Sequence, residues 1–163
     1  MFQLIVAVIS IALIAALAIA SIFYGGDAFN KGSLKANVTT LVNGGQQIAG
    51  AQALYRTDNA GANAADVAAL VAGEYLVQNP AVSGAATGEW EIDATGRLAS
   101  VLVVTGSNQL PVCIEGAKQS GVAAATADAL TVATLPADEP ANQFGCFTVD
   151  NAGETEVHFG FKI

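Results

Sequence analysis

Charged residues are missing from the start of the chain: no Asp, Glu, Lys or Arg occurs before Asp27. All 14 acidic and 6 basic residues of the 163-residue sequence lie from that position onward. Charged residues make up 12% of the chain, about half of what is usual in soluble domains, and 53% of the residues are hydrophobic. The length suits one domain with an appendage rather than two full domains. We expect the appendage at the uncharged N-terminus.

Basic residues are scarce throughout the sequence. The formal net charge is −8, and no two bases are closer in sequence than Lys31 and Lys35. A surface that follows a phosphate backbone needs clustered Lys and Arg side chains. The composition therefore argues against nucleic-acid binding, and we interpret the acidity as a contribution to solubility.

Residues that carry catalytic chemistry are also few. The single histidine, His158, lies on a predicted strand between Val157 and Phe159. General acid or base catalysis needs a partner within hydrogen-bond reach, and no motif supplies one. Neither a P-loop nor a dinucleotide-binding fingerprint occurs. We therefore expect no enzymatic activity, no catalytic residue and no cofactor, and a structural or surface role for His158.

Two groups of acidic residues are candidate cation sites. Alternation along one predicted strand places three carboxylates on one face, those of Glu89, Glu91 and Asp93. We interpret this as a solvated face, with cation binding as the alternative. A later predicted turn carries potential calcium ligands at Asp150, Asn151 and Glu154. Because the spacing of an EF-hand loop is absent, no metal site is predicted there.

The sequence has two cysteines, Cys113 and Cys146. Neither their spacing nor a nearby histidine indicates zinc. Two cysteines that follow a membrane segment fit one disulfide in an oxidising compartment, and two buried free thiols are the alternative. A disulfide closing a loop of this length would stabilise the fold by roughly 3–4 kcal/mol.

The uncharged segment contains a twenty-residue apolar run over residues 4–23, in which only Ser10 and Ser21 are polar. A helix of this length spans the ~30 Å hydrocarbon core of a bilayer. A cleaved secretory signal fits poorly, because no base precedes the run and the run exceeds the usual ~7–15 residues. Two interpretations remain: a single-pass anchor, or a helix that first sits in the membrane and later forms the core of a filament.

Charge gives conflicting information about orientation. Lys31 and Lys35 follow the apolar run, so the positive-inside rule places them in the cytoplasm, whereas a disulfide requires an oxidising compartment on that side. A removed leader peptide with basic residues would reconcile the two. The precursor gene sequence tests this hypothesis.

Beyond the apolar run the sequence predicts an α+β architecture, a long helix packed on an antiparallel sheet. Gly25, Gly26 and Gly32 predict a weakened or unwound stretch over residues 22–32. The helix then resumes with one apolar face and ends near Arg56–Asn59. The residues of that face recur at steps of three and four: Leu34, Val38, Leu41, Gly45, Ile48, Gln52 and Tyr55.

Turn signals and periodicity predict the remaining elements. They are a helix over residues 63–75, a hairpin of 90–93 and 98–104, a helix over 111–119, a surface loop over 120–143, and a hairpin of 144–149 and 155–163.

Taken together, these features resemble a type IV pilin, closest to the b subclass. The similar features are the uncharged N-terminal helix, the following charge at Asp27, the amphipathic continuation Leu34–Arg56, the segment GEYLVQNP and the closing strand Glu156–Lys162. In the family a disulfide bounds a variable region near the C-terminus, and the resemblance assigns that role to Cys113 and Cys146. The resemblance also divides the chain into two parts. Residues 1–26 form a membrane and filament-core helix, and residues 27–163 form an amphipathic helix with a globular head.

The resemblance implies a structural subunit of a pilus that serves adhesion, motility, DNA uptake or conjugation. The subunit would wait in the inner membrane, be polymerised by the pilus assembly machinery and end in an extracellular homo-oligomeric filament. The expected assembly residues are Met1, Phe2, Gln3, Leu4, Ile5, Ile9, Leu13, Leu17 and Phe23. Met1 would carry the N-methylated amine of the family. The alternatives are a pseudopilin of a type II secretion system and a membrane-anchored periplasmic or viral binding module.

The sequence departs from the family pattern in two places. No leader peptide with its glycine is visible, so we expect either that the sequence is the processed form or that the protein is leaderless. In addition, Ile5 stands where the family has a glutamate that is thought to pair with a neighbour's N-terminal amine. An ammonium group buried without this partner would cost several kcal/mol. Three explanations remain open: a blocked Met1 amine, a polar pocket around Gln3 and Ser10, or a minor or divergent pilin.

Overall fold

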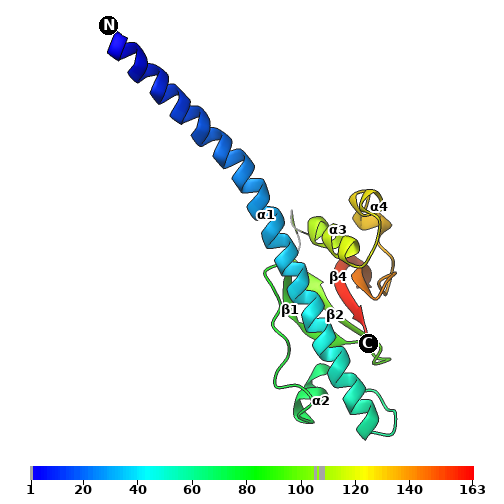
Figure 1. Ribbon diagram of the computed structural model, residues 1–163. Coiled ribbons are helices and arrows are strands. Elements are labelled where there is room, and N and C mark those ends of the chain that lie inside the picture. Colours follow the sequence, from blue (N-terminus) through cyan, green and yellow to red (C-terminus); the bar gives the residue numbers. More distant parts are fainter. Residues whose placement is uncertain (1, 105, 107–108) are drawn as a thin grey trace. The chain divides into compact units, whose positions relative to one another are not determined.

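The computed structural model describes the backbone of residues 2–104, 106 and 109–163, and leaves the side chains of residues 23–28 undescribed. The chain forms two compact units, Met1–Ser33 and Leu34–Ile163. In chain order the elements are α1 (Phe2–Asp58), α2 (Val67–Ala72), β1 (Ala86–Ile92), β2 (Leu98–Val103), α3 (Gln109–Gln119), α4 (Ala124–Asp128), the 3-10 turn η1 (Val132–Thr134), β3 (Phe144–Asn151) and β4 (Glu154–Lys162) (Figure 1).

Helix α1 is helical at every residue from Phe2 to Asp58, so the prediction of an unwound stretch over residues 22–32 is wrong. Each glycine costs about 1 kcal/mol relative to alanine inside a helix. However, extending a helix that already exists is much more favourable than nucleating a new one. The helical segments on both sides therefore carry the helix through the glycines. The predicted end near Arg56–Asn59 is confirmed.

The predicted apolar face of α1 is also confirmed in the second unit. Its central residues are buried and the residues at its two ends, Leu34 and Tyr55, are half-buried. Gln52 is the one buried polar side chain on this face within the described chain. Its amide donates to the carbonyl of Gly96 at 3.1 Å and accepts from the backbone N–H of Ala64 at 3.3 Å. The first bond joins α1 to the turn between β1 and β2, and the second joins it to the segment before α2; together they supply the partners that a buried amide needs.

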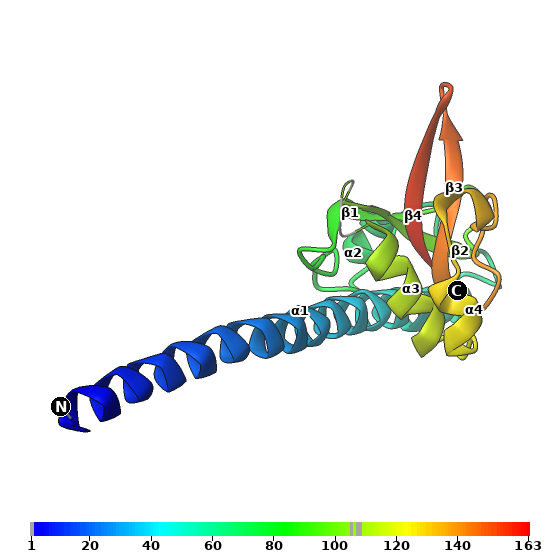
Figure 2. The same ribbon diagram turned by 90° about the horizontal axis from the view of Figure 1, so that it is seen from above.

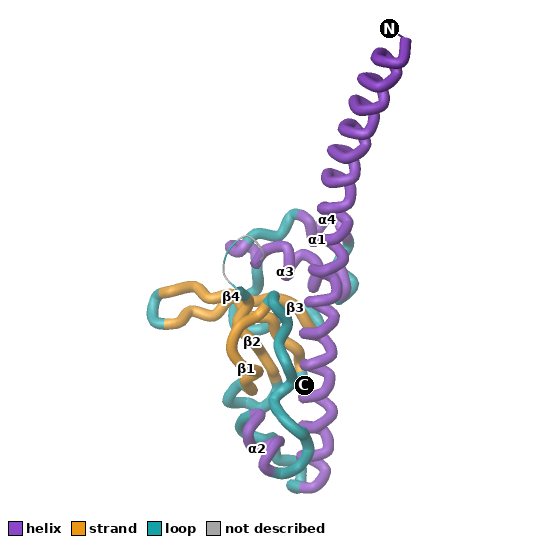
Figure 3. The backbone as a smooth tube through the Cα atoms, turned by 90° about the vertical axis from the view of Figure 1, so that its left-hand side faces the viewer, coloured by secondary structure: helices purple, strands orange, loops and turns teal. Residues whose placement is uncertain are grey.

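Within the described residues, four strands form an antiparallel sheet in the order β1-β2-β4-β3 (Figure 3). Both predicted hairpins are confirmed: β1 pairs with β2, and β3 pairs with β4. Strand β1 begins earlier than predicted, at Ala86, and its pairing with β2 is irregular between Thr87 and Glu91. The central contact between the hairpins is β2 with β4.

Two adjacent glycines bring α1 into close contact with the sheet. A methyl group added at Gly44 would lie 2.9 Å from Nε1 of Trp90, and one added at Gly45 would lie 2.5 Å from Cβ of Phe161. Real side chains do not tolerate such separations. The sheet therefore packs directly on the helix backbone at this point, and the absence of a side chain at the two glycines permits this contact.

Gly45→Ala is expected to destabilise the second unit by about 1–3 kcal/mol, because it overpacks the contact with Phe161. Gly50→Ala is the matched control, since nothing lies within 4 Å of a methyl group added there. That substitution should stabilise by up to about 1 kcal/mol through helix propensity alone. Denaturant unfolding of the detergent-solubilised chain, followed by Trp90 fluorescence, measures both. Equal effects of the two substitutions would contradict the close packing.

The connecting segments differ from the predictions in two places. The helix predicted over residues 63–75 is confirmed only as α2, which Asp66 caps by accepting from the N–H of Ala69 at 2.6 Å. It ends at Ala72, with Gly73 as its C-cap, before the predicted Tyr75. The segment 120–143 is not all loop, because it contains α4 and η1. These short helices have weak periodicity and depend on tertiary packing.

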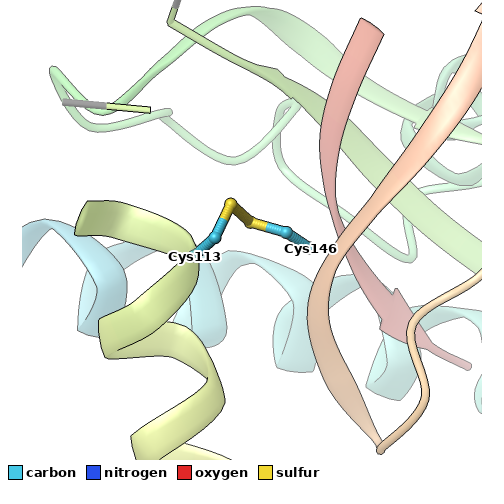
Figure 4. Close-up of a disulfide and its surroundings, with 2 residues drawn as sticks. All are labelled: Cys113 and Cys146. Carbon is cyan, nitrogen blue, oxygen red and sulfur yellow. A yellow bond between two sulfur atoms is a disulfide. The ribbon is translucent and has the colours of Figure 1, made fainter. Parts of the chain in front are cut away.

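Helix α3 is confirmed and carries Cys113, which forms a disulfide with Cys146 of β3 (Figure 4). Both cysteines are buried. The alternative of two free thiols is therefore wrong. The bond ties α3, and the segment that follows it, to the edge strand of the sheet.

Candidate functional site

The candidate site is the apolar part of α1 in the first unit. Phe2–Ile22 has a mean hydropathy of 2.9 and is the one described helix that is long and apolar enough to cross a membrane. None of it is buried within the structure. A helix that is apolar on all sides is normally surrounded by protein or lipid. This segment therefore needs a nonpolar environment that the described chain does not supply.

The structure places the expected assembly residues on this helix and leaves their side chains exposed. They are Phe2, Gln3, Leu4, Ile5, Ile9, Leu13 and Leu17. Met1 lies outside the described residues, and so does the side chain of Phe23, whose backbone is helical. The exposed side chains surround the helix instead of forming one stripe, so a partner can pack on any side.

The two serines of the apolar run find their hydrogen-bond partners inside the helix. The hydroxyl of Ser10 donates to the carbonyl of Val6 at 2.8 Å, and that of Ser21 donates to the carbonyl of Leu17 at 2.9 Å. Such bonds let a hydroxyl enter an apolar environment without an external partner. Ser10 is thus already satisfied, which weakens the explanation that it forms a polar pocket with Gln3.

Position 5 carries no charge that could pair with an amine. Ile5 is 56% exposed, and residues 2–22 contain no carboxylate. Of the three explanations for the departure from the pilin pattern, a blocked Met1 amine requires no additional group on this helix.

His158 lies on β4 and contacts an acid but no nucleophile among the described residues. Its Nε2 is 3.3 Å from Oε2 of Glu156, and its ring packs near that of Phe147. Its Nδ1 is buried without a hydrogen-bond partner in the part of the chain that the structure describes. This arrangement is a strand side chain packed against its neighbours, and no reaction step can be assigned to it.

The predicted carboxylate face on β1 is only partly correct. Glu89 and Glu91 are exposed, whereas Asp93 turns inward at the end of the strand. Its Oδ1 accepts the backbone N–H groups of Arg97 and Leu98, both at 2.8 Å. Its Oδ2 accepts the N–H and the hydroxyl of Thr95. Asp93 therefore holds the β1–β2 turn. The Asp-x-Thr-Gly pattern before β2 is the sequence signal for this role.

These contacts shift the titration of Asp93. Burial opposes ionisation, but the hydrogen bonds from Thr95, Leu98 and Arg97 outweigh it and hold the pKa of Asp93 below its ordinary value of 3.8. A carboxyl with a lowered pKa in the folded state stabilises the fold above its unfolded pKa. That stabilisation is lost as the pH falls through the folded pKa.

Asp93→Asn is therefore expected to lower stability at neutral pH and to reduce the loss of stability between about pH 5 and pH 2. Urea unfolding at a series of pH values measures this. Glu74→Gln is a suitable control, because Glu74 is exposed and its carboxylate has no hydrogen bond in the described structure. A pH dependence identical to that of the unmodified chain would contradict the assignment.

In the turn between β3 and β4, the acidic and amide side chains make local hydrogen bonds and do not converge on a cation site. Asp150 accepts the N–H of Gly153 at 3.0 Å, and Asn151 donates to Glu156 at 3.4 Å. Among the described residues no group of three or more His, Cys, Asp or Glu side chains could hold a metal ion.

Two of the cavities in the described structure have no signal in the sequence. One is a small apolar cavity of about 80 Å³ beside the disulfide, with Leu130, Leu135 and Phe144 in its wall. The other is a polar cleft of about 300 Å³ on the outer face of the sheet, with Glu89, Glu91 and Glu156 in its wall. Each combines residues far apart in the chain, so only the folded structure reveals it.

No protein-family model, curated protein or solved structure matches this chain.

Proposed function

We propose that this chain is the structural subunit of a type IV pilus filament and polymerises through the apolar part of α1. The observation that carries the proposal is the charge-free helix Phe2–Ile22, which is entirely unburied in the isolated chain. Because lipid and a bundle of like helices both satisfy such a surface, the same segment can serve as a membrane anchor and then as a filament core.

The second unit supports this proposal. A long helix, an antiparallel sheet and one disulfide between Cys113 and Cys146 are consistent with the α+β fold expected of a pilin. The secretion pseudopilin and the membrane-anchored binding module share the helix but have no particular feature of the structure in their favour.

The proposed mechanism is physical and assigns no catalytic residue. The subunit waits in the inner membrane with the start of α1 in lipid, and the assembly machinery moves it into the growing filament. There the helix exchanges lipid for neighbouring helices. Small side chains at one end of the apolar run allow helix backbones to approach closely. They are Ala12, Ala15, Ala16, Ala18 and Ala20.

The N-terminal amine expected at Met1 needs either an opposite charge or a modification in this mechanism. Because Ile5 provides no carboxylate, a charged amine in the filament core would be unpaired. We propose that the amine is blocked by a modification that removes its charge, because the N-methylation expected at Met1 would leave the nitrogen cationic. Intact-mass measurement of the purified subunit tests the modification, and an unmodified mass would contradict it.

Electron microscopy of material sheared from the surface of cells that express the chain tests the proposed function. Long thin filaments that label with an antibody to the second unit, and that yield this chain by mass spectrometry, are expected. Recovery of the chain only as membrane-bound monomer, with no labelled filament, would contradict it and would favour the anchored binding module.

A further inference from the structure

Strands β1 and β3 form the two edges of the sheet, because the strand order is β1-β2-β4-β3. An edge strand carries a row of backbone N–H and C=O groups with which the strand of another chain can pair. Proteins that do not use such pairing cover, distort or charge their edges. Second units of several copies come close together in a membrane or a filament, so the state of these two edges decides whether the sheets associate.

One side chain bonds to the edge of β1. Asn79, in the segment between α2 and β1, donates from Nδ2 to the carbonyl of Trp90 at 3.0 Å, and its Oδ1 accepts the backbone N–H of Trp90 at 3.3 Å. A residue of a neighbouring antiparallel strand exchanges the same two bonds with the residue opposite. Like a peptide group, a carboxamide has both an N–H donor and a carbonyl acceptor. Asn79 therefore takes the place of an added strand at Trp90.

The edge of β1 beside Asn79 is accessible from outside the sheet. A groove of about 310 Å³ follows the strand from Glu89 to Ile92, and its opposite wall is residues 66–68 at the start of α2. Asn79 is half-buried in this groove, and Pro80, which follows it, is buried and has a fixed φ. These two residues end the segment GEYLVQNP, to which the filament mechanism assigns no task. The segment thus holds the Asn79 amide against an edge that another chain could reach.

The opposite edge of the sheet is covered by backbone. The N–H of Thr148 in β3 donates to the carbonyl of Pro136, and the carbonyl of Thr148 accepts the N–H of Asp138, both at 2.9 Å. The residue between these two, Ala137, forms a short parallel bridge with Thr148. In each edge strand, one residue near the middle therefore has both of its outward backbone groups bonded by a group that belongs to no strand.

The part of β3 beyond this cover belongs to a projecting hairpin. Strand β2 pairs with β4 only from His158 to Lys162, so residues 154–157 of β4 pair with β3 alone. Figure 2 shows β3 and β4 extending past β1 and β2. Asp150 and Glu154 are exposed on this hairpin, and residues 149–157 contain no Lys or Arg. Hairpins of two copies therefore repel each other, and charge is a further way in which edges are protected.

We propose that Asn79 prevents β1 from pairing with a strand of a second copy, and so confines the association of copies to the apolar part of α1. The inference goes beyond the proposed function, because the protection acts wherever second units come close, in a membrane as in a filament. Of the protections described, this one depends on a single side chain. Without the amide, both outward groups of Trp90 would lack a partner inside an accessible groove, and pairing with another chain would satisfy them.

Asn79→Ala in the full chain tests the inference. In detergent solution the variant should form sheet-rich associates at concentrations at which the unmodified chain keeps its size, with thioflavin T fluorescence raised at least about tenfold. Sedimentation velocity measures the size, and far-UV circular dichroism of a dilute sample shows that the variant is folded. A folded Asn79→Ala variant that keeps the size of the unmodified chain would overturn the inference and leave the filament function standing.

Two further variants separate exposure of the edge from loss of stability. Asn63→Ala removes another half-buried asparagine, whose amide donates to the carbonyl of Thr95 at 2.8 Å in the β1–β2 turn and not at a strand edge. Asn79→Asp keeps the acceptor for the N–H of Trp90, loses the donor and places a negative charge at the edge. Both variants lose a hydrogen bond but should not associate, because the edge stays covered or charged. Association of either variant to the extent of Asn79→Ala would overturn the inference.

Hydrogen exchange in the unmodified chain is a test that needs no substitution. The backbone N–H of Trp90 should exchange at least about tenfold more slowly than an unprotected amide, although its partner is a side chain and not a strand. Nuclear magnetic resonance of the detergent-solubilised chain measures the rate for this single amide. Exchange at the rate of an unprotected amide would mean that Asn79 does not hold the edge, and would overturn the inference.

Discussion

Leu13→Arg is expected to remove the chain almost completely from membranes and from filaments. Leu13 lies near the middle of the apolar segment Phe2–Ile22. An arginine at the centre of a membrane-spanning helix costs about 2.5–3.5 kcal/mol on insertion scales, which corresponds to roughly a hundredfold change in partitioning. In a filament the same charge would be buried among apolar helices without a partner, which is also unfavourable.

Leu54→Arg is the matched control for this prediction. Leu13 and Leu54 are both leucines of α1 with 60% of the residue exposed, but Leu54 belongs to the second unit. The control should remain in membranes and keep its fold. Alkaline extraction of membranes, followed by microscopy of sheared filaments, measures both steps. Equal retention of the two variants would show that the apolar segment serves neither as anchor nor as filament core.

Removal of the disulfide is expected to have the second large effect. The double variant Cys113→Ala and Cys146→Ala should lose roughly 3–4 kcal/mol of stability, because the bond closes a loop of 33 residues that the unfolded chain would otherwise explore freely. The double variant is preferable to a single one, since it leaves no free thiol. It also removes the link between α3 and β3.

Denaturant unfolding of the detergent-solubilised chain measures this loss. The unmodified chain, unfolded with and without a reductant, is the internal control and should show a similar difference. In the native state the reductant alone should act slowly, since both sulfur-bearing residues are buried. A loss below about 1 kcal/mol would mean that packing around α3 holds the loop without the bond, in contrast to the chain-entropy expectation.

The elements that the sequence predicted well are those with strong local signals. The face of α1 follows from apolar residues spaced three and four apart, and the two hairpins follow from turn residues between β-forming runs. In each case the signal is repeated several times within a short segment. The secondary structure that the segment prefers locally is then the one that its tertiary environment also favours.

The wrong predictions arose where local preference and context compete. The glycines of residues 22–32 disfavour helix locally, but the helix on either side extends through them. Gly44 and Gly45 have the same low helix propensity, but their lack of a side chain permits contact with Trp90 and Phe161. A glycine has the same propensity in both settings, and only its neighbours in space decide whether it weakens or enables the structure.

The sequence by itself determined that residues 4–23 require an apolar environment, because no charge and only two hydroxyls interrupt them. It also indicated a long amphipathic helix on an antiparallel sheet. The tertiary structure decided that Cys113 and Cys146 are bonded, that Asp93 holds a turn, and that Glu89, Glu91 and Glu156 share one cleft. The physical reason is that hydropathy and periodicity are properties of residues close together in the sequence. The contacts named above join residues that the folded chain brings together, and the shared cleft depends in addition on the register of the strands.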